Sequence, residues 1–318
     1  MSDLSEDELL EAIRRVLSGA GPEVVVGPGD DAAVLAPASG ELVITTDVMV
    51  EGVHFDPALT SARDLGYKAL IVNLSDIAAM AASPRSAVCA LTIGGRPDVG
   101  WTIELLGGMR EACDEHALWL VGGDLSRGGV TSIAVTVTGE VAPGHAVLRS
   151  GAKPGDRLVV TGSLGGSAAG LRASGRRGSW SEDERDAIRR HVRPSARVGE
   201  GAVLARHGAT AMMDVSDGLA LDLSRLASAS GVGARLELAA VPLHPAATFA
   251  EALGGGEDYE LLAALPVGEV DAARAELADA FGTPLADVGE ITDAGIESVA
   301  EDGTVRPLEP AGWDHFAG

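Results

Sequence analysis

Acidic residues of this 318-residue chain stand where strand-like segments end, and their carboxylates could bind metal ions there. Gly27-Pro28-Gly29-Asp30-Asp31 directly follows one apolar segment, and Thr45-Thr46-Asp47 ends another. Hydroxyl and carboxylate oxygens are hard ligands that suit Mg²⁺, and no His or Cys ligand set accompanies them to favour zinc. Each motif alone is also typical of a solvated turn or of a capped strand end.

Two further acidic positions extend this pattern, and a histidine lies close to one of the motifs already named. Asn73 and Asp76 share one face of an otherwise apolar helix, where an unpaired charge is costly and a bound cation would offset the cost. Val121-Gly122-Gly123-Asp124 repeats the order of strand, glycine and aspartate. His54, in the segment after Asp47, could contact an anionic substrate, although an isolated loop histidine is more often structural.

The fifth acidic motif lies at a junction between a strand and a helix. Asp214, Ser216 and Asp217 gather there, and the first turn of the helix would present free N–H groups to an anion. Ser216 or Asp217 is also expected to cap the helix, but a cap uses one side chain and does not explain Asp214. The Gly-rich run at 160–170 lacks a Walker lysine and a clean dinucleotide fingerprint, which favours close packing of a strand on a helix.

Charge and cysteine content narrow the classes of protein. Acidic residues number 47 against 24 basic ones, and a net charge of −23 repels nucleic acid and anionic membranes. The N-terminus is an acidic amphipathic segment rather than a signal peptide, and no apolar run is long enough to span a membrane, so we expect a cytoplasmic protein. Cys89 and Cys113 stand in apolar surroundings and are expected to be core residues.

Mixed strands and helices predict α+β domains rather than a doubly wound parallel sheet. Helices are expected at Ser61–Ala82 and Val99–His116. The pattern restarts near residue 150, which predicts an N-terminal domain at 1–150 and a C-terminal domain at 151–318. The polar stretch Ser174–Arg185 is expected to be a mobile surface segment. Strands are expected at Glu23–Val26, Leu42–Thr46, Ala87–Ile93, Leu118–Val121, Thr131–Val141 and Arg157–Thr161.

Taken together, these motifs resemble the thiamine-monophosphate kinase family, whose superfamily includes aminoimidazole ribonucleotide synthetase and selenophosphate synthetase. The resemblance runs almost from end to end of the chain. It is carried by GPGDDAAV (27–34), TTDVMVEGVHF (45–55), NLSDIAAMAASP (73–84), GGDLSRG (122–128), RSGAKPGD (149–156), VTGSLGGSAAGL (160–171), MDVSDGL (213–219), GGEDYEL (255–261) and GWDHF (312–316).

The resemblance implies Mg²⁺-dependent phosphoryl transfer from ATP to thiamine monophosphate. It also implies a homodimer in which N-terminal strands of two subunits form a β-barrel. The implied residues fall into three groups: metal ligands Asp30, Thr45, Thr46, Asp47, Asp76, Asp124, Asp214 and Asp217; ATP contacts Gly123, Asp124, Arg149 and Ser216; and substrate contacts His54, Glu257 and Trp313. No general base is expected, because the second pKa of a phosphomonoester is about 6 and the acceptor is already anionic.

Other functions remain open at this stage. Another ATP-dependent synthetase of the superfamily is one alternative, although the N-terminal reactive Cys loop of selenophosphate synthetase is missing. A regulatory protein that binds nucleotide and metal without catalysis is another.

Overall fold

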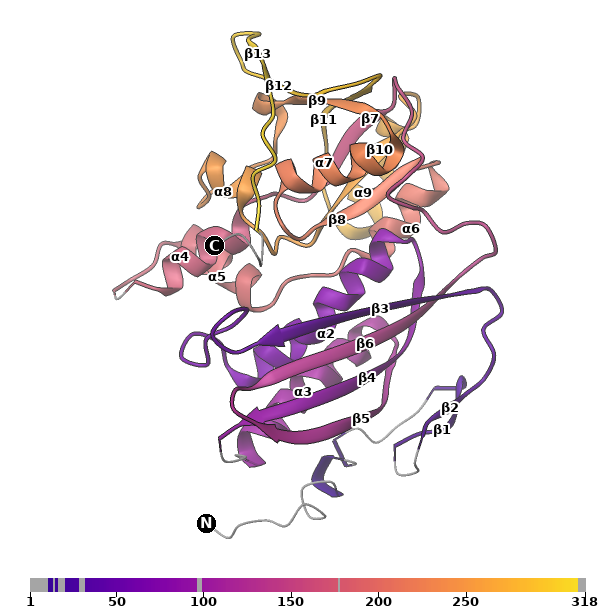
Figure 1. Cartoon of the computed structure of the whole chain (residues 1–318), viewed down its shortest axis with the longest axis vertical. Helices are drawn as coiled ribbons and strands as arrows, with labels where there is room; N and C mark the ends of the chain where they lie inside the picture. Colours follow the sequence, from indigo (N-terminus) through magenta and orange to yellow (C-terminus); the bar gives the residue numbers. More distant parts are fainter. Residues whose placement is uncertain are drawn as a thin grey trace. The chain divides into compact units, whose positions relative to one another are not determined.

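The computed structural model describes residues 11–13, 15–16, 21–28, 32–95, 99–176 and 178–313. Asp30 and most of the amphipathic N-terminal segment lie outside these residues. The chain forms two compact units: one comprises Met1–Ile77 and Ser83–Gly144, and the other comprises Ala78–Ala82 and His145–Gly318 (Figure 1). Among the described residues, no helix is long and apolar enough to cross a membrane.

The first unit is built on a four-stranded sheet in the order β3-β6-β4-β5. Its strands are β3 (Glu41–Val50), β4 (Ser83–Gly94), β5 (Trp119–Gly128) and β6 (Ser132–Val141). β6 pairs antiparallel with β3 and β4, whereas β4 and β5 run parallel and are joined through a helix. A mixed sheet of this kind agrees with the predicted α+β class. A short antiparallel pair, β1 (Val24–Val26) and β2 (Val34–Leu35), precedes the sheet.

Helices α2 (Ala62–Ala79) and α3 (Val99–His116) cover one face of this sheet (Figure 1). They approach closely because glycine replaces a side chain at their contact: a Cβ on Gly66 would lie 1.8 Å from the carbonyl oxygen of Leu105. The middle of α2 is almost completely buried, so its polar residues sit in an apolar setting. Burial of this face positions Asp76 against the sheet.

The second unit contains a seven-stranded sheet with helices on both faces. In sheet order its strands are β13 (Val305–Pro307), β12 (Ile296–Val299), β9 (Gly233–Glu237), β11 (Leu285–Thr292), β7 (Arg157–Thr161), β10 (Glu260–Leu265) and β8 (Ala211–Val215). Its helices are α4 (Gly166–Ser174), α5 (Glu182–Val192), α6 (Val198–Arg206), α7 (Leu219–Ser230), the short 3₁₀ helix η1 (Leu238–Ala240), α8 (Phe249–Gly254) and α9 (Val270–Phe281).

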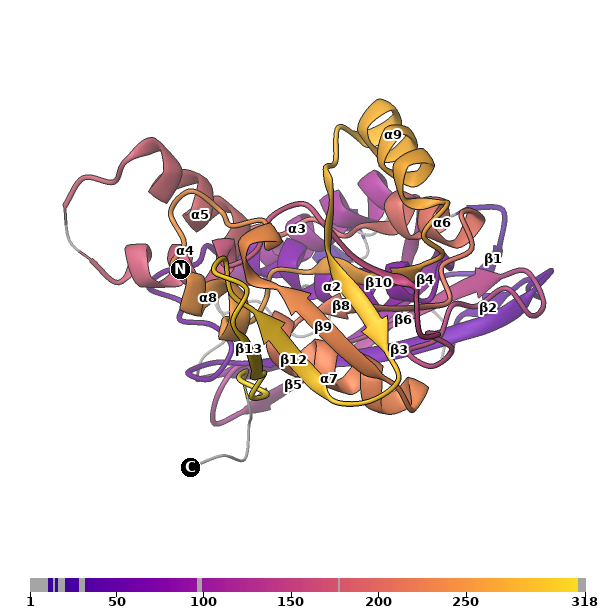
Figure 2. The ribbon, with the colours of Figure 1, turned by 90° about the horizontal axis from the view of Figure 1, so that it is seen from above.

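Alternate residues of the central strands face two separate hydrophobic cores. Leu158 and Val160 point into a core that α7 completes, whereas Val159 points into a core that α6 and α9 complete. Figure 2 shows α7 and α9 on opposite sides of the sheet. Because both faces are covered, β8 and β10 are buried along their whole length.

The observed elements largely confirm the sequence prediction. Strand β7 and helix α3 have the predicted bounds, while β3 and β5 run several residues further than expected. The prediction of a mobile segment at Ser174–Arg185 is wrong in its second half, where α5 begins at Glu182. Ser181 and Glu184 form a capping box that starts this helix. Cys89 and Cys113 are buried free thiols, as predicted, and burial raises the pKa of each to about 12.

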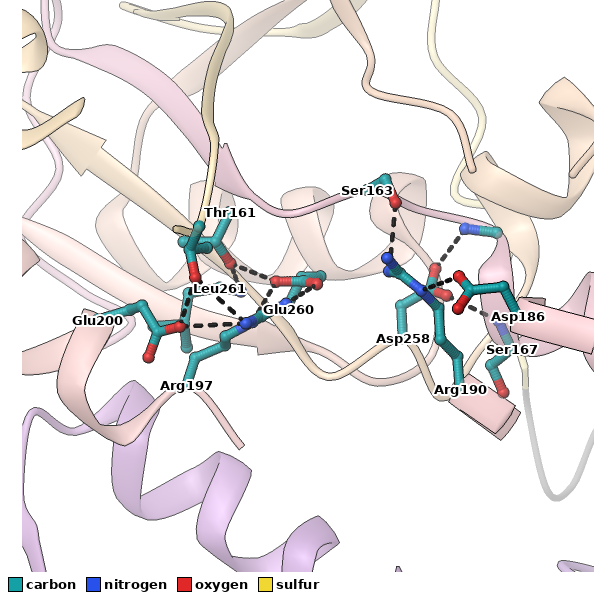
Figure 3. A network of polar contacts seen from close by, with 12 residues as sticks. Thr161, Ser163, Ser167, Asp186, Arg190, Arg197, Glu200, Asp258, Glu260 and Leu261 are labelled. Atoms are coloured by element: carbon teal, nitrogen blue, oxygen red, sulfur yellow. Dashed lines mark hydrogen bonds and ion pairs between the residues drawn. The ribbon is translucent and has the colours of Figure 1, made fainter. Parts of the chain in front are cut away.

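A buried ion network joins α6 to the sheet of the second unit (Figure 3). Arg197 donates through Nη2 and Nε to the two carboxylate oxygens of Glu260, at 2.6 and 2.7 Å. It also donates through Nη1 to Glu200, at 3.1 Å. Thr161 and Thr283 donate their hydroxyls to Glu260 and Glu200 respectively. One guanidinium therefore compensates two buried carboxylates.

Replacing Arg197 by alanine should lower the free energy of unfolding by about 3–5 kcal/mol, since both carboxylates would remain buried without their cation. Urea unfolding at pH 7 measures this loss. The matched control is Arg206→Ala, which removes an exposed pair with Glu276 and should change stability far less. Equal losses in the two variants would contradict a dominant role for the buried network.

Candidate functional site

Two predicted metal ligands of the first unit lie on the face of β3 that is turned toward the helices. Alternation along the strand puts Thr45 and Asp47 on this partly buried face. Thr45 Oγ1 donates to Asp76 Oδ2 on α2 at 2.5 Å, which ties the strand to the helix. The Thr45 hydroxyl and the carboxylates of Asp47 and Asp76 thus lie close together, between one face of β3 and helix α2.

The electrostatics of this neighbourhood favour a cation. Burial, and secondly the negative charge of Asp76, raises the pKa of Asp47 to about 6. Two carboxylates that share a partly dry site repel each other, and either a proton or a cation relieves the repulsion. The chemistry of the donor set is therefore that of a site for a hard divalent ion.

Asn73 adds a second observation that fits a cation. Its side chain is completely buried in α2, one helical turn before Asp76. The amide nitrogen Nδ2 donates to the carbonyl oxygen of Ala69 at 3.1 Å, but Oδ1 has no hydrogen-bond partner among the described residues. Buried polar atoms are rarely left in this state, so a carbonyl oxygen here suits a ligand or its hydration shell.

Thr46 and Asp124 lie on the opposite face of the sheet. Asp124 pairs in register with Ala90 of β4, and Ala90 is exposed. Asp47 pairs with Val135 of β6, which in turn pairs with the buried Cys89 of β4. The Thr46 hydroxyl donates to the carbonyl oxygen of Val135, and the Asp124 carboxylate accepts from Ser126. The prediction that Asp47 and Asp124 stand at strand ends is wrong, because both lie inside strands that pair beyond them.

The Asp214 motif in the second unit is organised by a residue that the sequence reading missed. The buried Asp222 in the first turn of α7 accepts from the N–H groups of Ser216, Asp217 and Gly218 at 3.0–3.1 Å. The expected N-cap by Ser216 or Asp217 is therefore wrong: Gly218 occupies the cap position, without a side-chain bond. The sequence indicates this role of Asp222 through the place of an acidic residue at the fourth position of the helix.

The same junction holds two predicted metal ligands. Asp214 is buried within β8, opposite Leu261 of β10. Asp217 forms an ion pair with Arg225, which also binds Asp222 at 2.9 Å. Asp214 thus lies one residue before the end of its strand, and the turn at 216–218 follows, where Asp217 lies and where Asp222 accepts three main-chain hydrogen bonds.

Two of the predicted substrate contacts lie beside this turn. The main-chain N–H groups of Glu257 and Trp313 donate to the carbonyl oxygens of Ser216 and Asp217, at 2.7 and 2.9 Å. The Trp313 residue is 52% exposed, so it does not serve as a buried anchor for the chain end. The second unit alone therefore brings Glu257 and Trp313 to the Asp214 junction.

His54 and Arg149 occupy different settings. The Nδ1 atom of His54 accepts from the N–H of Val50 at 3.0 Å, which fixes the ring against the turn after β3. Arg149 is exposed, and its carbonyl oxygen accepts from Ser230. Gly123 lies under the backbone of β4, where an added Cβ would come within 2.0 Å of the Cys89 oxygen. Only glycine fits this position.

The predicted metal ligands are divided between the two units. Thr45, Asp47 and Asp76 come together in the first, and Asp214 and Asp217 in the second. Within the described residues, no group of three or more His, Cys, Asp or Glu side chains is gathered in a way that could hold a metal ion. The first unit thus supplies a pair of carboxylates with hydroxyl and amide oxygens, rather than a complete cage.

The main-chain N–H groups of the Gly-rich run after β7 bind a carboxylate of the protein itself. Asp258 accepts from the N–H groups of Gly165 and Ser167 at 2.6 and 3.1 Å (Figure 3). These N–H groups belong to the start of α4, where an external phosphate would otherwise bind. Burial raises the pKa of Asp258 to about 7, and the two N–H bonds lower it in part. The run therefore has a structural role, close to the predicted one.

In the absence of divalent cations, Asp47→Asn should stabilise the protein at pH 7. The folded-state pKa of about 6 lies above the ordinary value of 3.8, so the folded protein retains a proton that the unfolded chain releases. Stability consequently falls as pH rises from about 4 to about 6, and the full cost remains above that range. The variant avoids this cost, which is on the order of 1–2 kcal/mol after allowance for partial exposure.

Urea unfolding in chelator at pH 4 and pH 7 checks this prediction. The gain should be present at pH 7 and absent at pH 4, while the control Asp124→Asn on the exposed face should show little change at either pH. A gain of equal size at both pH values would mean that ionisation of Asp47 is not its source.

Comparison with known proteins identifies the family to which the chain belongs. Residues 29–141 match the AIR synthase related protein, N-terminal domain, and residues 153–301 match the corresponding C-terminal domain. Thiamine-monophosphate kinase of Escherichia coli (strain K12) is 41% identical over 314 residues, which cover 93% of each protein. A crystal structure of thiamine-monophosphate kinase from Stenotrophomonas maltophilia K279a is 35% identical, with a TM-score of 0.83 over 94% of this chain and 97% of that one.

A further solved structure is described as AaThiL complexed with AMPPCP and TMP. It is 31% identical to this chain and covers 99% of each chain, with a TM-score of 0.78. Sequence and fold agree over nearly the whole length in each case. The chain belongs to the thiamine-monophosphate kinase family of the AIR synthase related proteins.

Proposed function

We propose that this protein transfers the γ-phosphoryl group of ATP to thiamine monophosphate and forms thiamine diphosphate. The observation that carries the proposal is the neighbourhood of Asp47 and Asp76, which raises a carboxylate pKa to about 6 and leaves a buried amide oxygen at Asn73. Such a site stabilises hard cations, and phosphoryl transfer requires them. The relative described with AMPPCP, an ATP analogue, and TMP supports the choice of both substrates.

Mg²⁺ is the metal that these oxygen ligands suit best. Thr45, Asp47 and Asp76 would hold it in the first unit, and Asp214 and Asp217 would bind further ions in the second. We extend the ligand set to Asp30, Thr46 and Asp124 from their match to the family motifs. Bound Mg²⁺ would neutralise the phosphate oxygens that approach each other during transfer.

The residues of the chain then act by position rather than by proton transfer. The acceptor phosphate has a second pKa of about 6 and is ionised at neutral pH, so no side chain needs to remove a proton from it. Asp47 and Asp76 would hold a cation in place between the strand and the helix. Asp222 keeps the turn of Asp217 rigid through three main-chain bonds, which limits the movement of its ligands.

The proposed substrate contacts fall into two groups, one for ATP and one for the thiamine part. We assign ATP contacts to Gly123, Asp124, Arg149 and Ser216. We assign the thiamine part to His54, Glu257 and Trp313. An exposed indole can stack on an aromatic ring or on the thiazolium cation, and Trp313 lies half-exposed beside the Asp217 turn. In this proposal the N-terminal domain, 1–150, binds metal and ATP, and the C-terminal domain, 151–318, completes the site.

We also propose that two copies pair through the outer face of the first unit's sheet. Four apolar side chains on this face are exposed: Leu42 (55%), Ile44 (62%), Val48 (48%) and Val88 (41%). Ala90 and Ala134 continue the stripe across β4 and β6. These apolar side chains lie on both sides of the polar Thr46, and exposed apolar residues gathered on one face of a sheet in this way mark an interface. A second copy is self-complementary to it, and strands of both sheets could close the β-barrel implied by the family resemblance.

The function is tested by ADP release from ATP and Mg²⁺ with thiamine, thiamine monophosphate or an aminoimidazole-pathway substrate. We expect activity only with thiamine monophosphate, and a loss of at least about 100-fold in kcat for Asp47→Asn and Asp76→Asn. Asp279→Asn, an exposed carboxylate on α9, should leave the rate unchanged. Binding of nucleotide without turnover would favour the regulatory alternative, and turnover that survives excess chelator would exclude the metal mechanism.

Replacing Ile44 by lysine should convert the dimer to a monomer, because the charge would be buried against the partner's apolar face. Sedimentation velocity of the wild type and the variant measures the change. Val267→Lys, which replaces an exposed valine of the second unit, is the matched control and should leave the dimer intact. A wild-type protein that sediments as a monomer would overturn the pairing.

A further inference from the structure

The loop that carries Glu257 has an unusual backbone. Glu257 and Tyr259 adopt positive φ values of 68° and 53°, in the left-handed region that side chains other than glycine rarely enter. Such conformations persist only where surrounding contacts enforce them, and they cluster at ligand sites. The loop between α8 and β10 is therefore held in a shape that local preference disfavours.

Main-chain contacts hold this loop from two sides. Glu257 N–H and Tyr259 N–H donate to the carbonyl oxygens of Ser216 and Val215, at 2.7 and 2.9 Å. On the other side, Asp258 accepts from Gly165 and Ser167, as Figure 3 shows. The direction in which the Glu257 side chain leaves the backbone is fixed as a result.

His191, at the end of α5, contacts the Glu257 side chain itself. Its residue is only 7% exposed. The ring atom Nδ1 lies 2.9 Å from Ser167 Oγ and 3.4 Å from Glu257 Oε2. Ser167 is thus contacted twice, through its N–H by Asp258 and through its hydroxyl by His191. A series of contacts therefore runs from Asp258 through Ser167 and His191 to the carboxylate of Glu257.

We propose that His191, supported by Ser167, is a positioning residue that orients the Glu257 carboxylate toward the cationic ring of the substrate. This inference rests on the proposed function. A carboxylate that is already held in place loses little freedom when it pairs with a thiazolium or aminopyrimidine group, so it adds more affinity than a mobile one. His191 acts on recognition of the thiamine part and does not touch the phosphates.

The test compares the Michaelis constants for thiamine monophosphate and ATP in the full-length protein. His191→Ala should raise KM for thiamine monophosphate by about tenfold, the effect of one lost polar contact, and change kcat and the ATP KM less than about twofold. His191→Asn should restore most of the affinity, because its amide reaches the place of Nδ1. Ser167→Ala should raise the same constant by a smaller factor.

A double-mutant cycle with Glu257→Gln separates positioning from a general effect on folding. The His191→Ala and Glu257→Gln double variant should be no worse than Glu257→Gln alone, since the histidine acts through that carboxylate. His207→Ala is the matched control. Like His191, His207 contacts glutamate side chains, but these are Glu269 and Glu276, on α9 and the loop before it. Its loss should change neither Michaelis constant.

The outcomes are distinct. An active wild type whose affinity is unchanged by His191→Ala would overturn the positioning role alone, as would additive losses in the cycle or equal increases in both Michaelis constants. A wild type without activity on thiamine monophosphate would overturn the proposed function and the positioning role together.

Discussion

Burial of the Asp47 carboxylate on β3, beside a second carboxylate at Asp76 on α2, is the constraint around which the first unit is organised. The sheet and the helix are both needed to bring the two charges together, and the partial burial of Asp47 weakens the screening of its charge by water. Folding thus creates an electrostatic cost that a cation can remove. In the proposed function, affinity for metal and reduced stability without metal would both follow from this geometry.

Carboxylates elsewhere in the protein are buried by other means. Asp222 and Asp258 accept main-chain N–H groups at turns, and Glu200 and Glu260 share the guanidinium of Arg197. These four acids are satisfied within the chain and serve to shape it. Asp47 lies instead beside a second carboxylate, that of Asp76, and the proposed function assigns this pair to a cation.

Sequence reasoning recovered the α+β class, most of the strands and helices, and the pair of Asp47 and Asp76. Periodicity alone could have placed Thr45 with Asp47 and Thr46 on the other face. It could not reveal that β3 and β5 continue past their aspartates, because pairing with neighbours set their length. Asp222, Asp258 and His191 were missed, since their roles depend on turns that bring distant segments together. The structure shows where the predicted site residues other than Asp30 lie, and the metal, nucleotide and substrate roles of all of them, Asp47 and Asp76 included, stay predictions.

The hydrogen bond from Trp313 to Asp217 has a consequence for the folding of the second unit. It joins residues almost one hundred positions apart in the chain. Closing so long a loop has an entropic cost, and the strands and helices that lie between the two residues must pack before the contact can offset it. The Trp313 contact is therefore expected to form late in folding and to be lost early when the second unit opens locally.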